Sequence, residues 1–194
     1  AMKAFKLLIK VHKVERYTAC ATSAMREAYN GKEVAELIKK KADIKILIID
    51  GKKEAAIIAS TDLHHLLKTD KTYLYVDVGG GSTEFSLFSN GKMVISKSFK
   101  IGTVRLLNGM VSDLVWLGIE EFIKTNTAEY DEISLIGSGG NINKLFKMSG
   151  KKMDEPLSYI YLNSQYTYLN SLSYERLMVE LDLNSDRADV IGFA

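Results

Sequence analysis

Three consecutive glycines between two strand patterns constrain this chain more than any other feature. Gly79-Gly80-Gly81 follow the apolar stretch 73–78 and precede the alternating stretch 85–88. Glycine loses more conformational entropy on folding than other residues, so a plain hairpin has no need of three in a row. The run therefore predicts a loop whose backbone lies close to a ligand.

The residues around these glycines suit a phosphate bound together with a hard cation. Glycines let successive N–H groups converge on an anion, and Ser82 and Thr83 add hydroxyl groups. Asp77, at the end of the first strand, could hold Mg²⁺ directly or through water. A glycine-rich hairpin without a ligand remains the alternative.

Other glycine-loop motifs fit this segment badly. A Walker loop needs Gly-Lys-Ser/Thr opening a helix, whereas here there is no lysine and a strand follows. A dinucleotide fingerprint also needs a helix, and a nucleophile elbow needs glycine where Glu84 stands.

A second glycine run lies between the apolar strand pattern 133–136 and a predicted helix that ends near residue 148. The amides at a helix N-terminus can receive a phosphate or another polar ligand. A tight turn that packs the helix on the sheet explains the glycines equally well, so both interpretations stay open. The run comprises Gly137, Ser138, Gly139, Gly140 and Asn141.

Strand and helix patterns alternate along the chain, which predicts an α/β protein. A polar break at 69–71 predicts two domains, 1–69 and 70–194. Arg26 falls in the first turn of one predicted helix and Glu54 at the start of another, 53–67. On the residues alone, Glu54 is a carboxylate of the capping region that suits the helix dipole, and Arg26 is a solvated helix residue. The predicted strands are 14–21, 44–49, 73–78, 85–88, 93–99 and 133–136, with an Asn-Gly hairpin at 90–91.

Composition excludes several classes of protein. The net charge of the 194 residues is only +2, so no global field attracts nucleic acid or anionic lipid, and we expect neither DNA, RNA nor a membrane as partner. No signal peptide or membrane-spanning run is evident, and the single cysteine, Cys20, cannot form an internal disulfide, which favours the cytoplasm. Cys20 lies in an apolar run and is expected to be a small core residue.

Four segments in order resemble the exopolyphosphatase/guanosine pentaphosphate phosphohydrolase (Ppx/GppA) family. They are 21–30, 49–55, 77–84 and 137–142, and the similarity extends to 187–189. The family belongs to the actin, Hsp70 and sugar-kinase superfamily. The resemblance implies two ribonuclease-H-like domains, each with a mixed β-sheet flanked by helices, and a phosphate site in the cleft between them.

The resemblance also implies roles for individual residues. Glu54 would be the general base that orients the attacking water, and Arg26 would neutralise phosphate charge. Asp77 would serve Mg²⁺, and Arg187 would act like Arg26. The phosphate ligands would be Gly79, Gly80, Gly81, Ser82 and Thr83. The implied reaction is Mg²⁺-dependent release of orthophosphate from polyphosphate or guanosine pentaphosphate.

One departure from the family pattern stands out. The family opens with a further phosphate loop of the type Asp-x-Gly-Ser-Asn, and no such motif precedes Ala21. We therefore expect the first domain to be incomplete and the chain alone to have little activity. Residues 187–194 look like the entry into another buried element, within which the sequence stops, so we expect the second domain to be truncated. A homodimer of the full-length protein stays open. The alternatives are a polyphosphate or nucleotide sensor with little turnover and a related ATPase or kinase.

Overall fold

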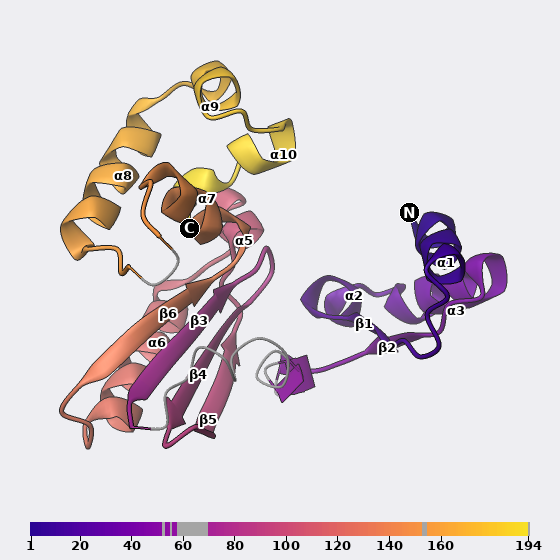
Figure 1. Cartoon of the computed structure of the whole chain (residues 1–194), viewed down its shortest axis with the longest axis horizontal. Coiled ribbons are helices and arrows are strands. Elements are labelled where there is room, and N and C mark those ends of the chain that lie inside the picture. Colours follow the sequence, from indigo (N-terminus) through magenta and orange to yellow (C-terminus); the bar gives the residue numbers. More distant parts are fainter. Residues whose placement is uncertain (52, 55, 58–69, 153–154, 194) are drawn as a thin grey trace. The chain divides into compact units, whose positions relative to one another are not determined.

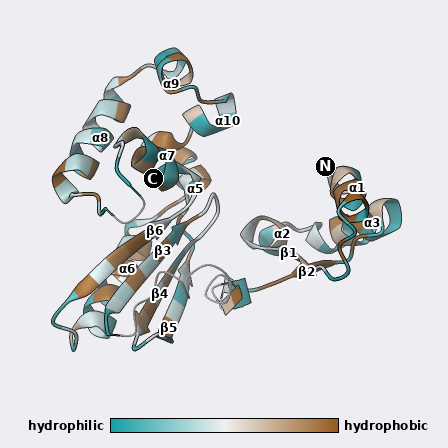
Figure 2. Ribbon diagram, in the orientation of Figure 1, coloured by the Kyte–Doolittle hydropathy of each residue, from teal (hydrophilic) through white to brown (hydrophobic). Residues whose placement is uncertain are grey.

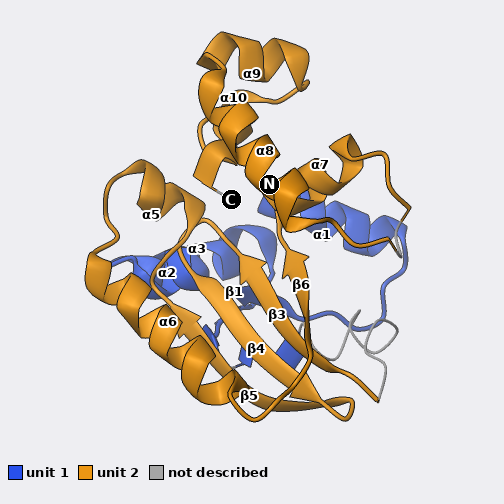
Figure 3. Ribbon diagram, turned by 90° about the vertical axis from the view of Figure 1, so that its left-hand side faces the viewer, with its two compact units in different colours: residues 1–64 blue, residues 65–194 orange. Residues whose placement is uncertain are grey.

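The computed structural model describes residues 1–51, 53, 54, 56, 57, 70–152 and 155–193 (Figure 1). The chain divides into two compact units, residues 1–64 and 65–194 (Figure 3). The predicted boundary between residues 69 and 70 falls at the edge of segment 58–69, which lies outside the described residues. That boundary therefore stays a prediction, as does the predicted helix beyond residue 57.

In the part of the chain that the structure describes, unit 1 combines two short parallel strands with helices on both sides of them in sequence, and residues 51, 53, 54, 56 and 57 are helical as well. Among the described residues, β1 and β2 form a two-stranded sheet in which Ala19 lies opposite Ile46 and Ala21 opposite Ile48. Both strands are shorter than predicted, since only three residues of each pair with the other. The elements are α1 (Met2–Val11), β1 (Ala19–Ala21), α2 (Ser23–Glu27), α3 (Gly31–Ala42) and β2 (Ile46–Ile48).

The prediction that Cys20 is a core residue is wrong, because its side chain is exposed. Cys20 pairs with Leu47 on one face of the two-stranded sheet, and Leu47 is exposed as well. An apolar run in a strand predicts burial only where another layer covers that face of the sheet.

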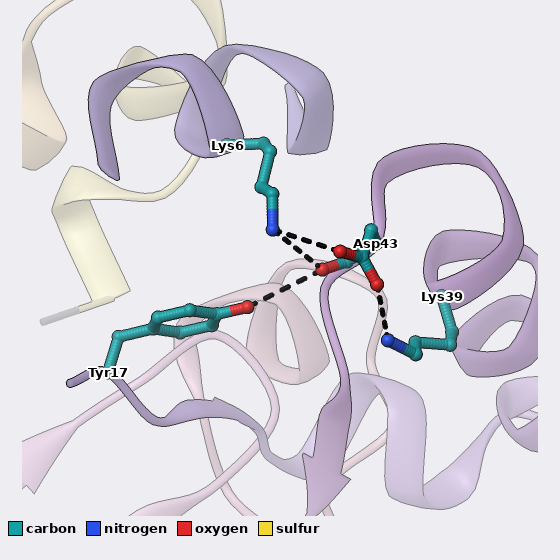
Figure 4. A network of polar contacts seen from close by, with 4 residues as sticks. All are labelled: Lys6, Tyr17, Lys39 and Asp43. Atoms are coloured by element: carbon teal, nitrogen blue, oxygen red, sulfur yellow. Dashed lines mark hydrogen bonds and ion pairs between the residues drawn. The ribbon is translucent and has the colours of Figure 1, made fainter. Parts of the chain in front are cut away.

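Asp43 ties three segments of unit 1 together (Figure 4). Its carboxylate pairs with Lys6 of α1 at 3.2 Å and with Lys39 of α3, and its carbonyl accepts a bond from the Tyr17 hydroxyl at 3.4 Å. The hydrogen bond from Lys39, followed by that from Lys6, lowers the pKa of the Asp43 carboxyl. Because this pKa is lowered, the ion pairs of Asp43 stabilise the fold at pH values above the ordinary carboxyl pKa. That stabilisation is lost as the pH falls through the pKa of Asp43 in the folded state.

Unit 2 is built on a four-stranded mixed sheet with the order β5-β4-β3-β6. β3, β4 and β5 are successive antiparallel strands, and β6 returns parallel to β3 after the crossover helix α6. This order is that of a ribonuclease-H-like sheet, so the predicted fold class is confirmed. The bounds are β3 (Thr72–Val78), β4 (Thr83–Ser89), β5 (Lys92–Phe99), α5 (Thr103–Leu107), α6 (Asp113–Thr127) and β6 (Ile133–Ser138).

The predicted hairpin between β4 and β5 is confirmed. Asn90 and Gly91 have φ values of 51° and 70°, the left-handed conformations that a type I′ turn requires at both central residues. Asn and Gly adopt this conformation more readily than other residues, which explains why this dipeptide closes the hairpin.

A hydrophobic core lies between α6 and one face of this sheet (Figure 2). Phe85 of β4, Phe99 of β5 and Phe122 of α6 meet edge to face, with ring centroids 5.5 to 6.5 Å apart. Such pairs add about 0.5–1.5 kcal/mol beyond the burial of their area. The opposite face of the sheet carries Asp77, Glu84 and Ser98, because successive side chains along a strand alternate between faces.

The remaining helices of unit 2 pack around a second core of leucines and Ile191. Its buried members include Leu145, Leu169, Leu177 and Ile191, of which Ile191 is only 1% exposed. No helix that the described residues form has the length and apolar character needed to cross a bilayer. The helices are α7 (Gly140–Met148), α8 (Tyr159–Ser171), α9 (Tyr174–Glu180), α10 (Ser185–Ala188) and the 3₁₀ turn η2 (Ile191–Phe193).

The substitution Ile191→Ala tests whether the C-terminal segment belongs to this core. We expect it to lower the free energy of unfolding by about 2–4 kcal/mol, because it leaves a cavity among the leucines. Val179→Ala on α9, where Val179 is 82% exposed, is the control and should change stability by less than about 0.5 kcal/mol. Urea unfolding followed by circular dichroism measures both; equal effects would contradict this packing.

Candidate active site

The triple-glycine loop joins β3 to β4 and is closed by a backbone hydrogen bond. The Gly79 N–H donates to the Ser82 carbonyl at 3.0 Å. Gly79 and Gly80 are exposed, whereas Ser82 and Thr83 are 5% and 4% exposed. The loop therefore presents glycine backbone at the surface and holds its polar side chains inward.

Thr83 has a role that its position in the motif did not indicate. Its hydroxyl donates to the carbonyl of Ile101 at 2.8 Å in a buried bond. In this geometry the hydroxyl fastens β4 to the chain beyond β5, and it is already engaged as a donor.

Asp77 lies in a row of polar residues that crosses the sheet. Its antiparallel partner is Glu84 and its parallel partner is Ser138, while Glu84 in turn pairs with Ser98. Directly paired residues place their side chains on the same face, with Cβ atoms about 4.5–5.5 Å apart in antiparallel pairs. Two carboxylates and two hydroxyls thus gather where β3 and β6 end.

Glu84 is a candidate site residue that sequence reasoning missed. It is 3% exposed, and its carboxylate accepts a hydrogen bond from the Ser98 hydroxyl at 2.8 Å. The hairpin pattern of the sequence could have revealed Glu84. In a hairpin with a short loop, residues at equal distances before and after the loop pair with each other, and this places Glu84 opposite Asp77.

These oxygens fit a Mg²⁺ ion that also binds substrate. Mg²⁺ usually takes one or two carboxylates and completes its octahedral shell with water and phosphate oxygens. Asp77 is half-buried and more accessible than Glu84, which makes it the better direct ligand. Within the described ranges no group of three or more His, Cys, Asp or Glu residues is placed to hold a metal, so an all-protein cage is not formed there.

The second glycine loop lies against the end of β3. Gly139 has φ +124°, and a Cβ atom there would stand 2.7 Å from the Val78 carbonyl oxygen. Both the backbone conformation and the close approach require glycine at this position. The two glycine loops, about 60 residues apart in sequence, therefore adjoin one another.

The C-terminal segment contacts the second glycine loop. A guanidinium nitrogen of Arg187 lies 2.9 Å from the place where a Cβ atom of Gly140 would be, and the Asn141 amide donates to the Val190 carbonyl at 3.0 Å. Asn141 is thus occupied in holding α7 to the segment after α10. The same contacts bring Arg187 to the N-terminus of α7, a place where an anion is favoured.

In unit 1, Arg26 and Glu54 belong to the helices that follow the two parallel strands. The Arg26 guanidinium donates to the Ile49 carbonyl at 2.7 Å. The carboxylate of Asp50 accepts from the Lys53 N–H at 2.8 Å and so caps the helix that carries Glu54. Because β1 and β2 are parallel, both helices begin at the same edge of the sheet.

Each unit thus collects its own candidates. Unit 2 brings together both glycine loops, Asp77 and Arg187, and unit 1 brings Arg26 to the strand end that precedes Glu54. The Asp50 cap was not predicted, although an Asp immediately before a helical pattern is a common sign of a helix N-terminus.

Gly139→Ala tests the contact between the two glycine loops. We expect it to destabilise the protein by about 1–3 kcal/mol, since alanine is strained at positive φ and would strike the Val78 carbonyl. Gly118→Ala in α6 is the matched control: its new methyl group would meet only Phe99 at 3.7 Å, and alanine favours a helix. Thermal unfolding compares the two; a neutral Gly139→Ala would show that the loops do not adjoin.

The sequence is similar to a known protein family and to a curated protein. The model of the Ppx/GppA phosphatase family matches residues 1–133. A guanosine-5'-triphosphate,3'-diphosphate pyrophosphatase from Photobacterium profundum is 28% identical over 186 residues, which cover 86% of this chain and 37% of the relative. The chain thus spans less than half the length of this curated relative.

Solved structures share the fold across almost the whole chain. An exopolyphosphatase from Cytophaga hutchinsonii superposes with a TM-score of 0.84 at 24% identity, covering 98% of this chain and 68% of that one. An Aquifex aeolicus Ppx/GppA enzyme has a TM-score of 0.68 at 25% identity, covering 98% and 69%. The chain belongs to the Ppx/GppA phosphatase family.

Proposed function

We propose that the protein hydrolyses terminal phosphoanhydride bonds, releasing orthophosphate from inorganic polyphosphate or guanosine pentaphosphate with the help of Mg²⁺. The observation that carries the proposal is the exposed glycine loop beside the paired carboxylates Asp77 and Glu84, within a chain of this family. Because the chain spans 37% of its curated relative, the activity is proposed for the full-length protein.

The two substrates share one chemical feature. A terminal phosphoryl group joined through a phosphoanhydride bond occurs both in polyphosphate and in the 5′-triphosphate of guanosine pentaphosphate. The relatives are named for one or the other, as an exopolyphosphatase and as a guanosine pentaphosphate pyrophosphatase. A loop that binds phosphoryl oxygens through its backbone recognises this shared group and leaves the choice of substrate to other surfaces.

The proposed reaction assigns one task to each candidate residue. The oxygen of a water molecule bonds to the terminal phosphorus, the bridging P–O bond breaks, and Glu54 takes the proton of the water. Arg26 and Arg187 offset phosphoryl charge, and the loop amides bind the non-bridging oxygens. When bound at Asp77, Mg²⁺ would supply positive charge for the leaving oxygen.

Glu54→Gln tests the role of the general base. In the full-length protein we expect the rate of phosphate release from polyphosphate to fall by about 10²–10⁴-fold, because glutamine cannot accept the proton. Glu33→Gln on the exposed side of α3 is the control and should retain the wild-type rate. Equal rates for Glu54→Gln and wild type would refute the assignment, and tight binding without turnover by the wild type would instead indicate a sensor.

Asp77→Asn tests the cation site. Replacing a carboxylate by a neutral amide removes the charge that Mg²⁺ prefers, so the Mg²⁺ concentration for half-maximal phosphate release should rise by about tenfold or more. Asp131→Asn, in the exposed turn before β6, should leave that concentration unchanged. A Mg²⁺ titration of initial rates measures both; activity that survives chelation with EDTA would contradict a Mg²⁺-dependent mechanism.

A further inference from the structure

The carbonyl groups of the triple-glycine loop all point toward α5. The N–H groups of Thr103 and Val104 donate to the carbonyls of Gly79 and Gly80, each at 3.0 Å, and the Arg105 N–H adds a longer bond to Gly80 at 3.4 Å. The side chain of Arg105 donates through Nε to the Gly81 carbonyl. Residues 103–105 of α5 thus donate hydrogen bonds to three successive carbonyls of the loop.

This arrangement fixes the direction of the loop amides. In a planar trans peptide the C=O and the following N–H point in opposite directions. If the carbonyls of residues 79, 80 and 81 face α5, then the N–H groups of Gly80, Gly81 and Ser82 face away from it. Three successive N–H groups aimed to one side form the kind of concave nest that binds an anion.

Gly102 allows α5 to approach this closely. A Cβ atom at Gly102 would lie 2.5 Å from both the carbonyl carbon and the oxygen of Gly80, and 2.7 Å from the oxygen of Gly79. Its backbone is extended, with φ −166°, so the requirement for glycine comes from this contact and not from its conformation. The neighbouring atoms are backbone and cannot rotate away as a side chain would.

We infer that α5 is the positioning element of the phosphate loop, with Arg105 as a positioning residue that aims the loop amides at the anion through its bond to Gly81. Arg105 acts on the carbonyl side of the loop, opposite to the amides. It is therefore distinct from Arg26 and Arg187, whose proposed task is to offset phosphate charge directly. This inference rests on the proposed phosphate-binding function, and it adds residues that the motif at 77–84 does not contain.

The competing explanation for any loss in an Arg105 variant is the loss of a positive charge near phosphate. Two substitutions separate the explanations. Arg105→Met removes both the charge and every side-chain N–H donor, whereas Arg105→Lys keeps the charge but loses the planar Nε donor. Positioning predicts that both variants lose affinity to a similar degree, and a direct charge contact predicts that the lysine variant retains it.

The experiment measures binding of inorganic tripolyphosphate, with Mg²⁺ present, by isothermal titration calorimetry. We expect Arg105→Met and Arg105→Lys to raise Kd by roughly tenfold, the effect of losing one hydrogen bond of a charged donor. Gly102→Ala should raise Kd at least as much, because it displaces the loop backbone. The control is Arg176→Gln, which removes the same charge from an exposed ion pair with Glu180 in α9 and should leave Kd unchanged.

A second measurement is made without any anion. Backbone ¹⁵N relaxation should give rigid order parameters of about 0.85 for Gly80, Gly81 and Ser82 in the wild type, falling below about 0.6 in Arg105→Met. Circular dichroism verifies that each variant is folded. This measurement judges the positioning role even if the wild type binds no tripolyphosphate, an outcome that would instead reject the proposed function.

Two results would overturn the inference. The first is wild-type affinity in Arg105→Lys together with reduced affinity in Arg105→Met, which would make charge the cause. The second is a loop that stays as rigid in Arg105→Met as in the wild type, which would show that Arg105 does not position it.

Discussion

The parallel pairing of β3 with β6 is the contact on which the candidate site depends. It places Asp77 beside Ser138 and turns the chain at Gly139 against the carbonyl of Val78. The ligands of open α/β sheets gather at the carboxyl ends of parallel strands, because the loops and helix N-termini that follow those strands meet there. Both glycine loops and Arg187 reach this one edge of the sheet for that reason.

Hydrogen bonds from neighbouring segments hold the loops of the candidate site in place. α5 binds the carbonyls of the triple-glycine loop, Thr83 fastens the start of β4 to Ile101, and Asn141 fastens α7 to Val190. Three glycines in a row would otherwise be the most mobile part of the unit, since glycine restricts its backbone least. Preorganised amides bind charge that develops during phosphoryl transfer without further rearrangement, so the rigidity that these bonds impose would favour the proposed reaction.

Much of the fold followed from local patterns, because local physics decides those features. The Asn90-Gly91 turn, the strand pattern on each side of Gly79-Gly80-Gly81, and the helix before Met148 needed no long-range information. The contacts of Gly102, Arg105 and Asn141 did need it, because each joins segments that only the folded sheet brings together. Cys20 was misjudged for a related reason: its run is apolar, but burial depends on a covering layer that a sequence pattern does not reveal.

Phosphate binding by the loop amides, at the edge of unit 2 near Asp77, is best tested by a crystal structure of the protein with Mg²⁺ and a non-hydrolysable imidotriphosphate. We expect phosphoryl oxygens within hydrogen-bond distance of the N–H groups of Gly80, Gly81 and Ser82, with Mg²⁺ at the Asp77 carboxylate. Phosphate found instead on surface lysines, with the loop amides unengaged, would contradict it.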